Sequence, residues 1–291
     1  MQKVVATCLV GIATLLAATT RAAEPAEGEA AWVFVENDQL RVGLLRSHGG
    51  AIGHLSDQRD GRNMLDHFDH GRMIQQSYYG DTDGSMWAEQ PWRYNPVQGG
   101  GYRGEPAEVV ELVAGDATAL VTTVPRHWAT GRRLPECTMQ QRLILKGPIL
   151  EVQYRFDYRG AKTHVARHQE TPAVFLAPRL HTFVTYAGEA AWQGQPLTQW
   201  IPGWPNEAAT LSENWAAYVG DDGVGLGVLV PGVTEATCYR FAAAGAACSY
   251  VAPVQTFALT PDLIFTYTAY FTIGDANTIR ERFALLRGAE K

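Results

Sequence analysis

Alternation of hydrophobic and polar residues dominates the chain and predicts antiparallel strands. Segments 33–35 and 40–44 both alternate, and Asn37 and Asp38 between them favour a tight turn. The same pattern of two strands around a short turn recurs at 109–113 with 119–124, at 138–145 with 149–158, and at 218–219 with 224–230. A long aromatic-rich strand is predicted over 263–273. In total we count about fifteen candidate strands, at the spacing typical of a β-sandwich.

Helical periodicity is clear in one place, at the C-terminal end. Asp275 is a suitable N-cap, and Ile279, Phe283 and Leu286 follow at helical spacing before Gly288. No repeat, linker or change of composition divides the rest of the chain. The sequence therefore predicts one all-β domain over 23–291, a large antiparallel two-layer β-sandwich with one C-terminal helix.

The first 22 residues have the pattern of a signal peptide. Lys3 precedes an apolar run at 4–18, and the small residues Thr20 and Ala22 suit a cleavage site. A membrane anchor is the alternative, but the run of about 15 residues is shorter than the roughly 20 that cross a bilayer. We expect an exported protein, periplasmic or extracellular, with no membrane span after cleavage.

Composition and charge narrow the possible functions. Of the 291 residues, 46% are hydrophobic and 19% are charged, which excludes a disordered chain and a coiled coil. The net charge of -6 argues against nucleic acid as a partner. The chain lacks a Gly-x-Ser-x-Gly elbow, a phosphate-binding loop and a His-Glu-x-x-His motif. The spaced glycines at 223–227 resemble a nucleotide-binding motif, but they fall within a predicted strand and lack the helix that such a motif requires. We therefore expect no cofactor and no metal.

Three cysteines lie beyond the predicted signal peptide: Cys137, Cys238 and Cys248. Export would place them in an oxidising compartment, where disulfides persist. Cys238 and Cys248 flank a small-residue segment that suits a hairpin turn, so we predict a bond between them. The alternative is three buried thiols.

The densest polar and aromatic segment runs from Gly71 to Gly100. Amide side chains bind sugar hydroxyls and aromatic rings stack on the apolar faces of pyranoses, so this segment indicates a carbohydrate surface. The alternative is a tight loop whose amides satisfy backbone groups. The candidate ligand-binding residues here are Arg72, Gln75, Gln76, Tyr78, Tyr79, Trp92, Asn95 and Gln98.

A second group of chemical side chains lies at 164–172. On an extended strand His164, His168 and Glu170 share one face, and an imidazole beside a carboxylate is a workable acid–base pair. His164 and His168 would be about 13 Å apart, too far to share a metal ion. Pro172 requires a break or an edge position. The alternative is a structural Glu170 that bonds to backbone groups.

The third group is Glu213, Asn214 and Trp215, at a junction between loop and strand. Asn214 and Trp215 are further candidate sugar contacts. Trp215 is two residues from Glu213, and burial against an indole would raise the pKa of that carboxyl, as a general acid needs. Glycoside hydrolysis commonly uses two carboxyl groups, so we predict Glu170 and Glu213 as a catalytic pair with His168 beside them.

The runs at 71–100, 169–174 and 213–217 resemble those of secreted bacterial β-sandwich proteins. Their architecture resembles the galactose-mutarotase-like supersandwich of epimerases, polysaccharide lyases and glycoside hydrolase domains. The resemblance implies an enzyme that acts on an oligo- or polysaccharide, and the carboxylate pair favours a glycoside hydrolase. The alternatives are a polysaccharide lyase using Tyr78, Tyr79, His168, Arg72 and Asn95, a non-catalytic glycan-binding domain, and an envelope protein whose Trp-rich loops bind another protein.

Overall fold

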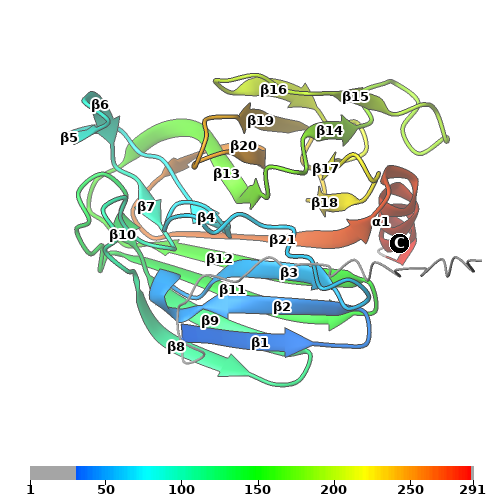
Figure 1. Cartoon of the computed structure of the whole chain (residues 1–291). Coiled ribbons are helices and arrows are strands. Elements are labelled where there is room, and N and C mark those ends of the chain that lie inside the picture. Colours follow the sequence, from blue (N-terminus) through cyan, green and yellow to red (C-terminus); the bar gives the residue numbers. More distant parts are fainter. Residues whose placement is uncertain (1–30, 290–291) are drawn as a thin grey trace, which may run out of the picture.

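Two large antiparallel sheets stack face to face, with one helix at the C-terminal end (Figure 1). The structure is a computed structural model that describes residues 31–289. The predicted signal peptide at 1–22 lies outside these residues. The predicted fold class, an antiparallel β-sandwich with a C-terminal helix, is confirmed.

The first sheet has ten strands, and the long strand β13 lies in its interior between β4 and β20. A short 3-10 turn at Arg46–His48 links β2 to β3. In spatial order its strands are β1 (Trp32–Glu36), β2 (Leu40–Leu45), β3 (Ala51–Asp57), β4 (Ile74–Ser77), β13 (His164–Leu176), β20 (Cys248–Leu259), β19 (Glu235–Phe241) and β16 (Glu207–Thr210), with β7 (Pro96–Val97) and β10 (Arg126–His127) joined beside β4.

The second sheet has nine strands and contains most of the hairpins expected from the alternating pattern. Its strands in spatial order are β15 (Thr198–Trp200), β14 (Thr182–Thr185), β17 (Trp215–Val219), β18 (Gly225–Leu229), β21 (Leu263–Gly274), β12 (Ile149–Tyr158), β11 (Cys137–Lys146), β9 (Thr118–Val124) and β8 (Glu108–Ala114). Within β12, alternate residues from Leu150 to Tyr158 are all buried, as the period of two requires.

The core fills the space between the sheets. Its main cluster joins side chains such as Val42 and Ile52 of the first sheet to Val152 and Phe271 of the second. Burial of such apolar surface is the main favourable term in folding. The packing of the two layers therefore depends on their inner faces, and the loops at the ends of the sheets are not needed to form this core.

Two stretches of the chain, 80–105 and 188–214, contain only short strands. The first includes a two-stranded hairpin of β5 (Thr82–Trp87) and β6 (Gln90–Arg93) that stands off the sandwich at the end opposite the helix (Figure 1). The second includes β15 and β16 at one margin of the two sheets. Neither stretch belongs to the main alternating pattern.

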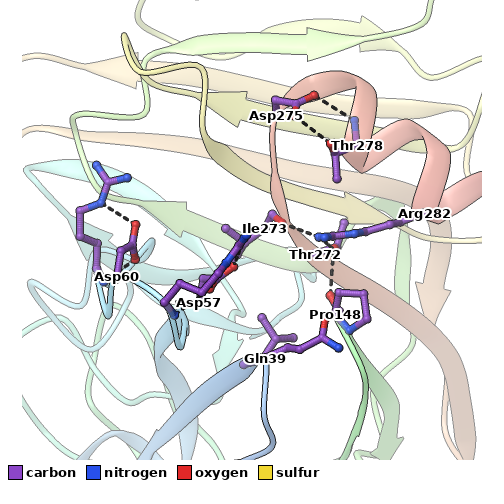
Figure 2. A network of polar contacts seen from close by, with 12 residues as sticks. Gln39, Asp57, Asp60, Pro148, Thr272, Ile273, Asp275, Thr278 and Arg282 are labelled. Carbon is purple, nitrogen blue, oxygen red and sulfur yellow. Dashed lines mark hydrogen bonds and ion pairs between the residues drawn. The ribbon is translucent and has the colours of Figure 1, made fainter.

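The helix α1 (Ala276–Ala289) begins where the sequence predicts, after Asp275. Asp275 accepts hydrogen bonds from the backbone amides of Asn277 and Thr278, each at 3.0 Å, which satisfies free amides of the first turn. Arg282 reaches back to β21 and donates to the Ile273 carbonyl at 2.6 Å (Figure 2). Within residues 31–289 no helix has the length and hydropathy to cross a membrane.

The glycines of 223–227 serve packing under the helix. A Cβ atom at Gly227 would lie 2.5 Å from Cγ2 of Ile279 and 3.0 Å from the Phe283 ring. A Cβ atom at Gly225 would lie 1.9 Å from the Tyr218 carbonyl oxygen on the neighbouring strand. These residues therefore allow α1 and β17 to approach β18 closely.

The predicted disulfide between Cys238 and Cys248 is not formed. Cys137, Cys238 and Cys248 are all free and buried. The two strands β19 and β20 do pair, but Cys248 lies opposite Phe241 and Cys238 lies opposite Val251. The two cysteines are therefore three positions out of register. Burial raises the pKa of the Cys238 thiol to about 12 and that of the Cys248 thiol to about 11.

Candidate functional site

One cavity combines a carboxyl group with an aromatic lining. It has a volume of about 400 Å³, and we call it the Glu170 cavity. Glu170 is the one carboxylic acid among the described residues that line it. The lining consists of Gly71, Ser77, Tyr79, Trp87, Trp92, Asn95, Val97, Trp128, Glu170, Phe175, Trp204, Pro205, Asn206, Tyr239 and Tyr250.

Strand pairing places the polar centre of this cavity. Glu170 of β13 lies directly opposite Ser77 of β4, so the two side chains share a face. Tyr79 follows two residues after Ser77 and reaches the same side. A shift of register between Glu170 and Val174, around Pro172, brings Tyr250 of β20 to Glu170 from the other neighbouring strand. The break expected at Pro172 is therefore a bulge that helps to build the cavity.

Two phenols hold the Glu170 carboxyl. The hydroxyl of Tyr79 donates to Oε1 at 2.9 Å, and the hydroxyl of Tyr250 donates to the same oxygen at 2.5 Å. Burial raises the pKa of Glu170 above its ordinary value, although the hydrogen bonds from Tyr250, Tyr79 and Ser77 oppose this shift. The carboxyl is therefore oriented by one oxygen, and its neutral form is favoured relative to an exposed glutamate.

The backbone around Tyr79 is fixed by a buried amide. The Tyr79 amide donates to Oε1 of Gln169 at 2.7 Å, and Nε2 of Gln169 donates to the Tyr79 carbonyl at 2.9 Å. Gln169 is fully buried. These two hydrogen bonds between the Gln169 side chain and the Tyr79 backbone set the position from which Tyr79 reaches Glu170.

Tryptophan rings form two sides of the cavity. On one side Trp87 of the β5–β6 hairpin contacts Trp92 at 4.7 Å and Trp128 at 5.9 Å between ring centroids. On the other side Trp204 contacts Tyr239 at 4.7 Å and is 59% exposed. Half-buried and exposed indole rings beside a hydrogen-bonding centre suit a ligand that has both apolar and hydroxylated surfaces.

Four of the sequence-predicted residues meet at this cavity: Tyr79, Trp92, Asn95 and Glu170. Asn95 is nearly buried and donates to the Tyr78 carbonyl at 2.8 Å, while its Oδ1 accepts a bond from the Trp92 indole at 3.3 Å. Asn95 therefore holds Trp92 in place, and the functional roles of these four residues remain predictions.

The three glutamines of the first segment do not line the cavity. Gln75, Gln76 and Gln98 are fully buried. Gln75 accepts from the Gly99 amide at 2.7 Å, Gln76 donates to the Gln140 carbonyl at 3.1 Å, and Gln98 accepts from the Gln76 amide at 3.2 Å. Their side-chain amides form hydrogen bonds with backbone groups around β4. This agrees with the alternative to a ligand-binding role that the sequence left open.

Three further candidates also lie elsewhere. Tyr78 points into the core against Phe156 and donates to Gln76. Arg72 bonds Asp66 at 3.1 Å and the Ala246 carbonyl at 2.8 Å. His168 is exposed on β13 and does not line the Glu170 cavity. The carboxyl of Glu170 is held by Tyr79 and Tyr250 and not by His168, so the predicted pair of His168 with Glu170 is not formed.

Glu213 lies apart from Glu170, under the helix and before a strand of the other sheet. It is fully buried and forms an ion pair with Arg280 of α1, whose Nε donates to Oε2 at 2.9 Å. Its oxygens also accept from the Trp192 amide and the Trp215 indole. Asn214 donates to the Val233 carbonyl at 2.8 Å and Trp215 is fully buried, so this group is structural and the predicted carboxylate pair is not formed.

Several lining residues were not among the candidates predicted from the sequence. Tyr250 belongs to an ordinary-looking strand, and Trp87 and Trp128 come from segments far from Glu170 along the chain. A tryptophan outside the strand pattern is the one hint that Trp128 and Trp204 offered. Among residues 31–289, no group of three His, Cys, Asp or Glu side chains is close enough to hold a metal ion.

Comparison with known proteins identifies the fold. No protein-family model matches the chain, and no curated protein matches its sequence. A galactose mutarotase-like protein from Lactobacillus casei is similar in structure, with a TM-score of 0.58, 11% identity and coverage of 84% of this chain and 100% of that one. A galactose mutarotase related enzyme from Lactobacillus acidophilus matches with a TM-score of 0.54, 12% identity and coverage of 84% and 97%. A putative aldose 1-epimerase from Escherichia coli matches with a TM-score of 0.53, 12% identity and coverage of 84% and 99%. The chain therefore has a galactose mutarotase-like fold.

Proposed function

We propose that the Glu170 cavity binds a carbohydrate and that Glu170 exchanges a proton with a sugar oxygen. The observation that carries this proposal is the meeting of Trp87, Trp92, Trp128 and Trp204 around one carboxyl held by two phenols. The galactose mutarotase-like fold is consistent with it, because one neighbour is described as a putative aldose 1-epimerase. Fold similarity alone does not give the activity.

The cavity suits a small, neutral sugar. Its volume of about 400 Å³ is at the lower end of the usual range for small-ligand pockets, which fits one or two sugar rings. Indole faces would stack on the apolar faces of a pyranose ring. Among the described residues that line it there is no lysine, arginine or histidine, so the lining offers no cation to an acidic sugar.

One carboxyl group favours a one-proton step. A protonated Glu170 would donate to the ring oxygen as its bond to the anomeric carbon breaks, and the proton of the anomeric hydroxyl would pass to water. The carboxylate that forms would be stabilised by the Tyr79 and Tyr250 hydroxyls. This step corresponds to ring opening of a free aldose. A glycoside hydrolase of the common type would need a second carboxyl, which this cavity lacks among its described lining residues.

The lyase alternative has less support. Of its predicted residues, only Tyr79 and Asn95 line the cavity. Burial and the charge of Glu170 keep the pKa of Tyr79 well above its ordinary value, which opposes the phenolate that a proton-abstracting base requires. A non-catalytic glycan-binding protein differs from our proposal only in the use made of Glu170.

Binding is tested by titrating the protein with neutral mono- and disaccharides and following tryptophan fluorescence. Trp204→Ala should weaken binding about tenfold, close to 1.4 kcal/mol, because an exposed stacking ring is lost. Trp32→Ala, on the edge strand β1 and outside the cavity lining, is the control and should bind as the parent does. If no neutral sugar binds, or if both variants behave alike, the proposal fails.

A further inference from the structure

A second cavity lies beside the β5–β6 hairpin and has a different character. Its volume is about 780 Å³, and none of its lining residues lines the Glu170 cavity. Three basic side chains, Arg132, Arg159 and Lys162, belong to its lining. We call it the cationic cavity.

Each of these three cations forms only a long ion pair, with Glu136, Asp262 and Asp81 respectively. The nearest carboxylate oxygens lie 3.8 Å from Arg132, 3.7 Å from Arg159 and 3.7 Å from Lys162, beyond hydrogen-bonding distance. Their side chains are 46–57% exposed. Other exposed arginines are paired much more closely, as with Arg59 and Asp57 at 2.6 Å or Arg133 and Glu108 at 2.6 Å. The donors around this cavity are therefore available to a ligand.

The two acids of the same lining are turned to protein donors. Asp83 accepts from the Ser85 hydroxyl at 2.6 Å with one oxygen and lies 2.8 Å from Nε2 of His127 with the other. Nδ1 of His127 accepts from the Ala129 amide, so Nε2 carries the proton and donates to Asp83. Glu136 accepts from the Tyr94 hydroxyl at 3.0 Å. Asp83 thus has both oxygens engaged and Glu136 has one, and the three cations of the lining outnumber these two acids.

The lining also limits the ligand class. Tyr94 and Tyr158 are 5% and 2% exposed, so neither offers a ring face for a nucleobase to stack on or an apolar floor for a lipid. Glycine backbone and hydroxyl groups at Gly84, Ser85, Thr130 and Gly160 make up much of the remaining lining. The volume is several times that of one inorganic anion. A hydroxylated molecule with more than one acidic group fits these features.

We propose that the cationic cavity is a binding site for an acidic oligosaccharide, whose carboxylates meet Arg132, Arg159 and Lys162. Arginine forms paired hydrogen bonds with carboxylates, and lysine adds a point charge. This site is separate from the Glu170 cavity and does not depend on the function proposed there. A sugar phosphate would present the same charge, so the test must distinguish the two sources.

The test is calorimetric titration of the whole protein with a galacturonate trisaccharide, with maltotriose, glucose 6-phosphate and inorganic phosphate as comparison ligands. The uronate should bind, its affinity should fall as salt rises, and maltotriose should give no signal from this site. Arg132→Gln with Arg159→Gln should weaken uronate binding tenfold or more, and Lys162→Gln should weaken it several-fold. The matched control is Arg46→Gln with Arg142→Gln, which removes two exposed guanidinium groups elsewhere and should leave binding unchanged.

Each other outcome overturns part or all of the assignment. Equal weakening in the control pair would mean that general charge, not this cavity, attracts the ligand. Equal binding of inorganic phosphate would reduce the site to a simple anion site, and preferred binding of glucose 6-phosphate would replace the carboxylate by a phosphate. Loss of uronate binding in Trp204→Ala would move the ligand to the Glu170 cavity. Thermal unfolding of each variant would show whether the exposed substitutions leave the fold intact.

Discussion

Glu170 and Glu213 occupy two regions of the molecule that differ in what surrounds a buried carboxyl. Glu213 is enclosed under α1, where the guanidinium of Arg280 pairs with both of its oxygens. Glu170 is held by the hydroxyls of Tyr79 and Tyr250 in a cavity whose described lining residues include no lysine, arginine or histidine. The first arrangement satisfies the carboxylate by an ion pair within the fold, whereas the second leaves a carboxyl that is held only by neutral hydroxyls at the wall of a cavity.

This difference shows that burial alone does not identify a catalytic acid. Both carboxyls are near aromatic rings, but only one lines a cavity that a ligand can enter. The hydrogen-bond donors also differ, because the charge of Glu213 is balanced within the fold while Glu170 accepts only from neutral hydroxyls, as our proposal for Glu170 requires. We therefore expect substitutions at the two sites to separate stability from activity.

The largest effect on stability is expected at the Glu213 site. Glu213→Gln leaves the guanidinium of Arg280 without a charge partner, and breaking a buried pair from one side costs about 3–5 kcal/mol. Urea unfolding of the variant and its parent measures this loss. Glu281→Gln, on the exposed side of the same helix, is the control and should change the unfolding free energy by less than about 0.5 kcal/mol. A loss of similar size in both variants would show that the ion pair is not the cause.

The pH dependence of stability should mark the Glu170 site. The folded pKa of Glu170 is raised above 4.5, so its stabilising contribution is complete below pH 4.5 and is lost as the pH rises through the folded pKa. Glu170→Gln removes this titration. The variant should therefore gain stability relative to the parent above pH 4.5, with a slope of at most about 1.4 kcal/mol per pH unit. Unfolding curves at several pH values measure it, and parallel curves for the two proteins would contradict the raised pKa.

The smallest effect is expected at the cap of the helix that carries Arg280. Asp275→Ala removes the acceptor for the Asn277 and Thr278 amides and should cost about 1 kcal/mol. The change should weaken the packing of α1 over Glu213 and leave the affinity for sugar at the Glu170 cavity within twofold of the parent. Asp275→Asn retains a capping oxygen and should restore most of the loss. A marked fall in sugar affinity would show that the two regions are coupled.

The fold could be predicted because its determinants are local. The period of two along β12 and the short turns at 37–38 and 146–148 each indicate a hairpin without knowledge of the rest of the chain. The helix was equally visible, since Asp275 and the apolar residues at helical spacing lie in one segment. The register of paired strands was harder to predict, as Cys238 and Cys248 show. A change in the length of the connecting turn shifts every residue to a different partner on the opposite strand.

The site was only partly visible because it is assembled across distant segments. Tyr250 reaches Glu170 through the pairing of β13 with β20 and a bulge near Pro172, neither of which has a local signal. The buried glutamines resemble ligand-binding amides in sequence, since an amide that satisfies backbone has the same side chain as one that binds a sugar. Glu213 resembled a catalytic acid because its ion-pair partner, Arg280, lies 67 residues away and could not be assigned to it from the sequence.

The most direct test of our account measures the interconversion of sugar anomers by NMR in the parent protein, in Glu170→Gln and in Glu213→Gln. A panel of free aldoses should include one whose exchange the parent accelerates. Glu170→Gln should reduce this acceleration by about 100-fold or more, since a general acid is lost, while the variant remains folded. Glu213→Gln, assayed below its unfolding temperature, should retain activity within a few-fold of the parent. Loss of activity in Glu213→Gln with full activity in Glu170→Gln would contradict the account.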